Sequence, residues 1–141
     1  MENQNIKKKE KEQENFYKNK MDIKEAQAKI RKFDEDRGWL NSWNLKDLML
    51  NINEEVGEMW NLVKWVGEKD QKRIVNEKKE EVSDFIGDSM FLLLKIANQT
   101  NVNSEKALEN TLAEFEERMP AEKMKEVGHA NKLSGGIDNK K

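Results

Sequence analysis

Two groups of acidic residues have the spacing of metal-ligating carboxylates. The first group comprises Glu54, Glu55 and Glu58, and the second comprises Glu81, Asp84 and Asp88. Residues three, four or seven apart share one face of a helix, so each group would present its carboxylates on one side. Apolar residues surround both groups, and a carboxylate buried among them without a partner is costly. A divalent cation would remove that cost, and oxygen ligands without His or Cys favour Mg²⁺, with Mn²⁺ as a substitute.

Other kinds of site fit these residues less well. Exposed helix acids paired with lysines are the plain alternative in a chain of which 38% is charged. A ferritin-like di-iron site also uses inward carboxylates, but it needs two Glu-x-x-His pairs. The chain has one histidine, His129, and no cysteine, which also excludes disulfides and thiolate chemistry. The carboxylates therefore favour a magnesium site.

Four helices are expected to carry these residues. Each follows a capping residue, and the first and last end at a glycine or before a proline. Between residues 22 and 120 there is no sustained period-two alternation and no Asn-Gly or Asp-Gly turn. The fold class is therefore all-α, an antiparallel four-helix bundle. The expected helices and their N-caps are 23–37 after Asp22, 45–66 after Asn44, 71–98 after Asp70 and 105–119 after Ser104.

The near-neutral net charge of −2 hides an uneven distribution. Residues 1–20 hold six lysines and four glutamates, and residues 121–141 hold five lysines and three acids. Between them, residues 21–120 hold 15 basic and 21 acidic residues, a net charge of −6. The two terminal segments have too little apolar surface to offset the conformational entropy that they would lose on folding. We therefore expect a flexible charged tail over 1–20, a folded domain over 21–120 and a polar, basic tail over 121–141.

The acidic residues also spell a recognisable signature. Glu-Glu-x-x-Glu is followed, after 22 residues, by Glu-x-x-Asp. This pattern resembles that of the all-α nucleoside triphosphate pyrophosphohydrolases, the MazG-like superfamily. Several flanking segments are similar in order and spacing to its dCTP pyrophosphatase branch, and the resemblance covers about residues 22–120. These segments are Arg37-Gly38-Trp39, Asn44 to Leu48, Glu55-Val56-Gly57-Glu58, Trp65 and Glu116 to Pro120.

The resemblance implies Mg²⁺-dependent hydrolysis of a nucleoside triphosphate, most simply a dNTP, to the monophosphate and pyrophosphate. It assigns catalysis and metal binding to Glu55, Glu58, Glu81 and Asp84, with Glu54 and Asp88 as further ligands. The aspartate remains open between two positions. The local pattern falls on Asp84, whereas counting back from Pro120 falls on Asp88, and the two are about one helical turn apart.

Substrate contacts are expected from aromatic and basic residues. Trp39 and Trp65 match positions that resemble the base-pocket aromatics of the family, where a nucleobase could stack. Trp60 is expected in the core, and Lys46 and Lys78 could add positive charge for the phosphates. Thr111 and Phe115 stand where the family has Lys and Asn on its last helix. The preferred base and sugar therefore stay open.

Other classes of function remain to be weighed. A non-catalytic helical adaptor that binds a protein partner is the alternative to an enzyme. Nucleic-acid binding is disfavoured because the central region is acidic and lacks a basic stripe. The longest wholly apolar run, Met90–Leu94, is far too short for a membrane span, so a soluble, cytoplasmic protein is expected. Apolar helix surface and the family resemblance imply a homodimer or homotetramer.

Overall fold

The computed structural model describes residues 21–127, which form helices joined by short loops. Contacts divide the chain into two units, the first ending at Val102 and the second beginning at Asn103. Within the described residues there are helices and no strands, so the predicted all-α class is confirmed. None of these helices combines the length and apolarity that a bilayer span requires. The tail expected over 1–20, and His129 in the other one, lie outside the described residues.

Helix α2 spans Ile23–Asp36 and begins as predicted at Asp22. The Asp22 side chain accepts from the backbone N–H of Glu25, and the Glu25 side chain accepts from the N–H of Asp22. This reciprocal capping box satisfies two backbone donors that a helix start leaves without partners. Arg37 is the C-cap of the helix, and Gly38 follows it at a φ of +66°, in the left-handed region. The chain can therefore turn back so that the N–H of Trp39 donates to the carbonyl of Asp34 at 2.8 Å.

Replacing Gly38 tests this turn. An L-residue in the left-handed conformation costs about 1–2 kcal/mol, and no other atom lies within 4 Å of a Cβ placed there. Gly38→Ala is therefore expected to lower the free energy of unfolding by about that amount through backbone strain alone. Urea unfolding followed by circular dichroism measures the change. A stability equal to wild type would contradict the strain argument.

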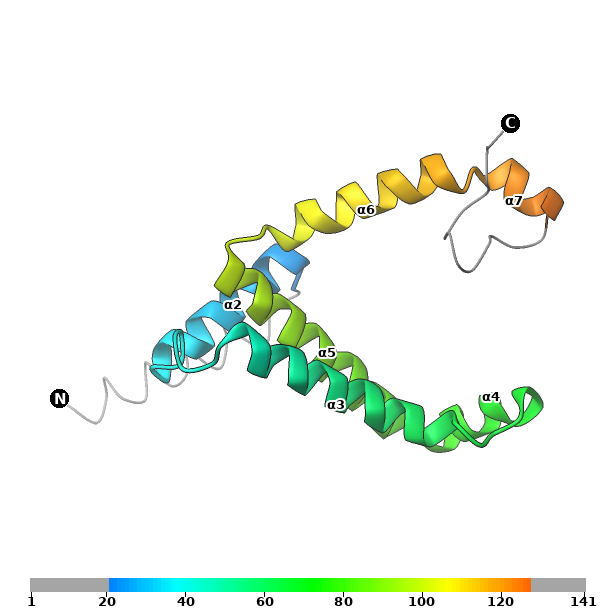
Figure 1. Ribbon diagram of the computed structural model, residues 1–141, viewed down its shortest axis with the longest axis horizontal. Helices are drawn as coiled ribbons and strands as arrows, with labels where there is room; N and C mark the ends of the chain where they lie inside the picture. Colours follow the sequence, from blue (N-terminus) through cyan, green and yellow to red (C-terminus); the bar gives the residue numbers. More distant parts are fainter. Residues whose placement is uncertain (1–20, 128–141) are drawn as a thin grey trace. The chain divides into compact units, whose positions relative to one another are not determined.

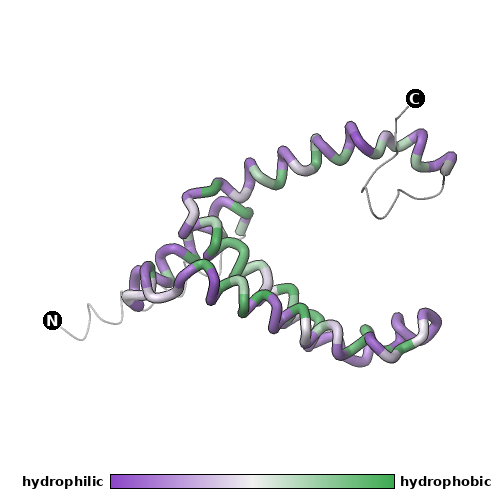
Figure 2. Tube along the Cα trace, in the orientation of Figure 1, coloured by the Kyte–Doolittle hydropathy of each residue, from purple (hydrophilic) through white to green (hydrophobic). Residues whose placement is uncertain are grey.

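The first unit is organised around helices α3 and α5, which run side by side in opposite directions (Figure 1). Helix α3 spans Leu45–Val63, and Asn44 caps it as predicted by accepting from the N–H of Asp47 at 3.0 Å. Helix α5 spans Lys79–Thr100, and α2 packs against its C-terminal half. Apolar residues concentrate in that half of α5 (Figure 2). The buried apolar residues of this core are Ala26, Leu48, Leu92, Leu94 and Ala97.

The predicted third helix, 71–98, is wrong in two respects. The chain forms α4 over Glu68–Glu77, which begins at Gly67 rather than Asp70, and it breaks at Lys78 before α5. Asp70 instead lies within the first turn of α4, 3.6 Å from Arg73. Between Val75 and Val82 the sequence is entirely polar. No apolar side chain there can pack a continuous helix against α3, so the chain turns.

The second unit contains α6 over Ser104–Arg118 and α7 over Ala121–Val127. The predicted cap of α6 is displaced by one residue, because Asn103 rather than Ser104 accepts from the N–H of Lys106. Asn is at least as good an N-cap as Ser. Helix α7 lies in the stretch expected to be a tail and follows Pro120, a residue that tolerates the start of a helix because it has no N–H.

Candidate metal and nucleotide site

The two acidic groups come together where α3 faces α5. Glu55, half-buried on α3, has a pKa raised above the usual value of a glutamate. The largest cause is burial, which disfavours the charged form. The next cause is the negative charge of Asp88 on α5, followed by those of Glu58, Glu54 and Asp84. The antiparallel register of α3 and α5 thus brings five of the six predicted acids into one electrostatic cluster.

Both candidate aspartates belong to this cluster. Asp84 and Asp88 are exposed, and each raises the pKa of Glu55. Of the two, Asp88 has the larger effect on that pKa. Because the two lie one turn apart on α5, both carboxylates can reach the side of the helix that faces Glu55.

Glu81 lies apart from the other acids. Its carboxylate accepts from the Lys78 ammonium at 2.7 Å, and this hydrogen bond is the main reason that its pKa is lowered. Glu81 is not among the charges that raise the pKa of Glu55. Lys78, predicted to contact the substrate, is therefore held at the start of α5 by a predicted metal ligand.

The cluster has oxygen donors of the kind that Mg²⁺ binds, but they are not closely grouped. Within residues 21–127, no three carboxylates converge tightly enough to enclose an ion. The cluster nevertheless offers only hard oxygen donors, which suit Mg²⁺. Glu58, Asp84 and Asp88 are exposed, so their side chains can rotate toward Glu55. The chemistry of the residues fits the ion, and the neighbouring negative charges that raise the pKa of Glu55 are consistent with that fit.

The four tryptophans have different surroundings. Trp39 and Trp43 lie in the loop between α2 and α3, where both line a cavity. Trp65 is 89% exposed beyond the end of α3, with the Lys64 ammonium 6.0 Å from its ring. Trp60 was expected in the core, and this is wrong, because it is 60% exposed. It lies on the flank of α3 that α5 does not cover, and Lys46 is exposed in the first turn of the same helix.

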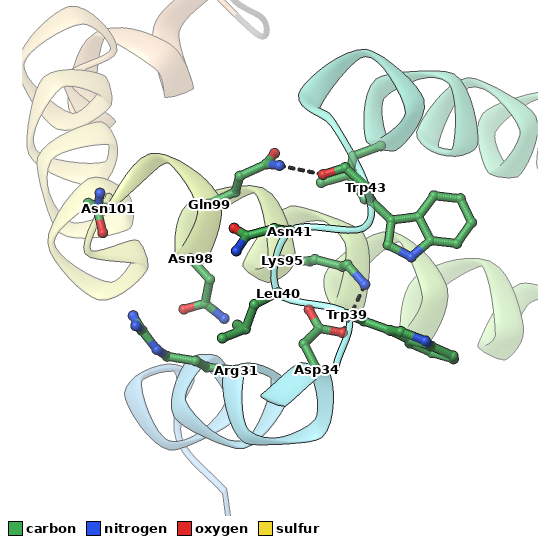
Figure 3. A pocket seen from close by; sticks show the side chains of 11 residues that line it. Arg31, Asp34, Trp39, Leu40, Asn41, Trp43, Lys95, Asn98, Gln99 and Asn101 are labelled. Carbon is green, nitrogen blue, oxygen red and sulfur yellow. Dashed lines mark hydrogen bonds and ion pairs between the residues drawn. The ribbon is translucent and has the colours of Figure 1, made fainter. Parts of the chain in front are cut away.

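A buried ion pair forms one wall of the cavity (Figure 3). The Lys95 ammonium on α5 donates to Asp34 on α2 at 2.8 Å, and the two side chains are 9% and 4% exposed. Three aromatic rings surround the ammonium, with centroids 5.7 Å away for Trp39 and Phe91 and 5.8 Å away for Trp43. At these distances the negative faces of the rings stabilise the cation.

The cavity has a volume of about 330 Å³, within the range of small-molecule sites. Trp39 and Trp43 lie on the side where the Lys95 ammonium ends, and Arg31 lies on the other (Figure 3). Gln99 holds the loop by donating to the carbonyl of Trp43 at 2.5 Å. The remaining lining residues are Asp34, Leu40, Asn41, Leu48, Asn98 and Asn101.

The cavity and the acidic cluster both lie along the line of contact between α3 and α5, which we call the seam. On α3, Leu48 lines the cavity and Glu55 follows seven residues later. On α5, Asp88 belongs to the cluster and Lys95 follows seven residues later. Residues seven apart share a face and are separated by about 10 Å along the axis. On both helices the cavity therefore lies two turns from the carboxylates. This separation of about 10 Å is about the length of a nucleoside.

Several lining residues were missed in the sequence, above all Asp34, Trp43 and Lys95. One signal could have identified Lys95, because it is the single charge in the apolar stretch Phe91–Ala97. A lysine in such a place must be paired if it is buried. Nothing in the spacing identifies Asp34 as its partner, since the two are 61 residues apart.

Comparison with known proteins supports the fold. No protein-family model matches the chain, and no curated protein sequence matches it either. Among solved structures, that of a pyrophosphatase from Archaeoglobus fulgidus is similar, with a TM-score of 0.63 and 24% identity. The match covers 72% of this chain and 95% of that one. The chain thus shares an all-α fold with a solved pyrophosphatase.

Proposed function

We propose that this protein is a Mg²⁺-dependent nucleoside triphosphate pyrophosphohydrolase of the MazG-like kind, similar to the dCTP pyrophosphatase branch. Its products would be a nucleoside monophosphate, from a dNTP in the simplest case, and pyrophosphate. The observation that carries the proposal is that the packing of α3 against α5 brings Asp84 and Asp88 near Glu55, and the charges of these and the other nearby acids raise the pKa of Glu55. The fold shared with an archaeal pyrophosphatase adds support.

The residues have distinct roles in this proposal. Glu55, Glu58, Asp84 and Asp88 would hold the ion, with Glu54 beside them and Glu81 after release from Lys78. Bound Mg²⁺ would neutralise triphosphate charge and lower the pKa of water. Glu55, whose pKa is raised, is suited to accept a proton on a carboxylate oxygen as water attacks the α-phosphorus. The bond from that phosphorus to the bridging oxygen breaks, and pyrophosphate leaves.

The substrate would extend along the seam between α3 and α5. Its phosphates would lie at the carboxylates, where Lys46 and Lys78 could supply positive charge. Its base would enter the cavity beside Trp39, two turns away. Trp65 lies outside that cavity and is too exposed to form a pocket alone, so it would stack on a substrate only with a further surface. A second copy of the chain could supply that surface.

Pyrophosphate release tests the activity directly. With Mg²⁺, the full chain is expected to release pyrophosphate from at least one of the common NTPs and dNTPs, and EDTA is expected to abolish release. Mn²⁺ should substitute. If no nucleotide is hydrolysed, the proposal is overturned and a non-catalytic helical adaptor becomes the better reading.

The exposed apolar surface of α3 and α5 supports a homodimer or homotetramer. Four apolar residues form a stripe along the outer flank of α3, which we call the α3 stripe: Leu45, Met49, Val56 and Trp60, all at least 40% exposed. Ile86, Met90 and Leu93 form another on α5. Large contiguous apolar patches on a protein surface mark interaction sites. We propose that a second copy covers them.

A charge placed in the α3 stripe is expected to break the assembly. Val56→Lys puts an ammonium where the partner must exclude water, so the oligomer should become a monomer. Sedimentation velocity measures the change, and Asn76→Lys, exposed on α4 and outside the stripe, is the matched control. A wild-type chain that is already monomeric would contradict the proposal and favour an adaptor whose stripe binds another protein.

A further inference from the structure

The Lys95 ammonium and the Asp34 carboxylate, which form an ion pair, can each make a further hydrogen bond. An ammonium has three N–H donors, and Lys95 uses one of them on Asp34. Asp34 accepts it with one oxygen, and its other oxygen points away from Lys95, toward the interior of the ring of lining residues (Figure 3). The cavity wall thus presents a donor and an acceptor side by side.

The position of the pair favours a ligand-binding role over a purely structural one. A buried ion pair contributes little net stability, since apolar residues of similar volume often do as well or better. Both residues of this pair also line a cavity. Trp39 and Trp43 lie beside it, and flat aromatic rings suit a flat ligand. The carboxylates that would hold the phosphates lie two turns away on the same seam.

We propose that Lys95 and Asp34 read the edge of the nucleobase and select keto bases, those with a carbonyl next to a ring N–H. Lys95 would donate to the base carbonyl, and the second oxygen of Asp34 would accept from the ring N–H. Uracil, thymine and guanine present this pair of groups, whereas cytosine and adenine present a ring nitrogen acceptor beside an amino group. The inference rests on the proposed function, because it takes the ligand to be a nucleotide. It adds which bases the site prefers.

The discrimination follows from the chemistry of the two groups. An ammonium donates most strongly to an oxygen acceptor, and a carboxylate accepts a ring N–H in a charge-assisted hydrogen bond. A base that lacks the ring N–H turns a lone pair toward the carboxylate, so two acceptors face each other and the second oxygen of Asp34 is left without a donor. A site built for one pattern of donors and acceptors therefore rejects the other strongly.

Uridine and cytidine provide a matched test, because they differ only at the edge in question. Binding of each to the full chain is measured by isothermal titration calorimetry without metal. Uridine is expected to bind at least about tenfold more tightly than cytidine. The double variant Lys95→Met/Asp34→Leu removes both charges together, so that neither is left buried alone, and it should abolish the preference. Lys95→Arg, which keeps the charge, should retain part of it.

A surface ion pair on the same helix gives the control. Lys32→Met/Asp36→Leu removes a pair joined at 2.8 Å outside the cavity and should leave the preference unchanged. Equal binding of uridine and cytidine, binding of neither, or a preference that survives the double variant would each overturn the inference. Because no metal or triphosphate is used, these results are independent of pyrophosphate release. Pyrophosphate release without a base preference would leave the proposed function standing alone.

Discussion

Glu58→Gln is expected to reduce Mg²⁺-dependent pyrophosphate release by about 100-fold or more. The substitution keeps the size of the side chain and removes one negative charge from the cluster around Glu55. Charge stabilisation by a bound metal is worth several kcal/mol, and each 1.36 kcal/mol is tenfold in rate. Because Glu58 is exposed, the variant should fold normally. Steady-state kinetics across a range of Mg²⁺ concentrations measures the loss.

A matched substitution separates this effect from a general change in charge. Glu68→Gln alters an exposed acid in the first turn of α4 and should leave turnover within about twofold of wild type, as expected for a surface change away from the site. The rise in Tm that Mg²⁺ and nucleotide produce should shrink in Glu58→Gln and persist in Glu68→Gln. If Glu58→Gln keeps wild-type turnover and metal affinity, the carboxylates do not form the metal site.

Lys95→Met is expected to lower the free energy of unfolding by about 3–5 kcal/mol, because it leaves Asp34 charged and buried without its partner. That is a large part of the total stability of a typical domain. Adding Asp34→Leu should restore most of the loss, since the buried charge is then gone. Urea unfolding followed by circular dichroism measures both variants.

The exposed pair of Lys32 and Asp36 again serves as the control. Lys32→Met should cost less than about 1 kcal/mol, because an exposed ion pair is weakened by solvent. If Lys95→Met and Lys32→Met cost the same, the burial of the Asp34–Lys95 pair has no energetic consequence. If the double variant is no more stable than Lys95→Met alone, the loss comes from packing rather than from the orphaned charge.

The parts of the fold that local chemistry determines could be predicted from the sequence. Asp22 and Asn44 cap their helices through hydrogen bonds to residues three positions later, so a short stretch contains the whole interaction. Asp70 failed as a cap because Gly67 precedes it and begins the helix earlier. The polar stretch between Val75 and Val82 could have indicated the break in the predicted long helix.

The candidate site could be predicted only in part. Spacing along each helix grouped the acids, but the proximity of Glu55 to Asp88 depends on the register between α3 and α5. The pairing of Asp34 with Lys95 depends on how α2 crosses α5, which spacing along the chain does not encode. Trp60 was misjudged because α3 has apolar residues on two flanks, and the sequence does not say which flank α5 covers.

The break at Lys78 gives the first unit unequal resistance to local unfolding. Helix α4 has no buried residue, and the ion pairs of Arg73 with Asp70 and Glu77 are exposed and lie within the helix itself. Segments with little buried surface open at a small fraction of the global free energy. Helix α4 can therefore fray up to the break at Lys78 while α3 and α5, which pack together and bury Leu48 and Leu92, stay paired. The end of the seam nearest the carboxylates is thus its most mobile part, and the end nearest the cavity its most rigid.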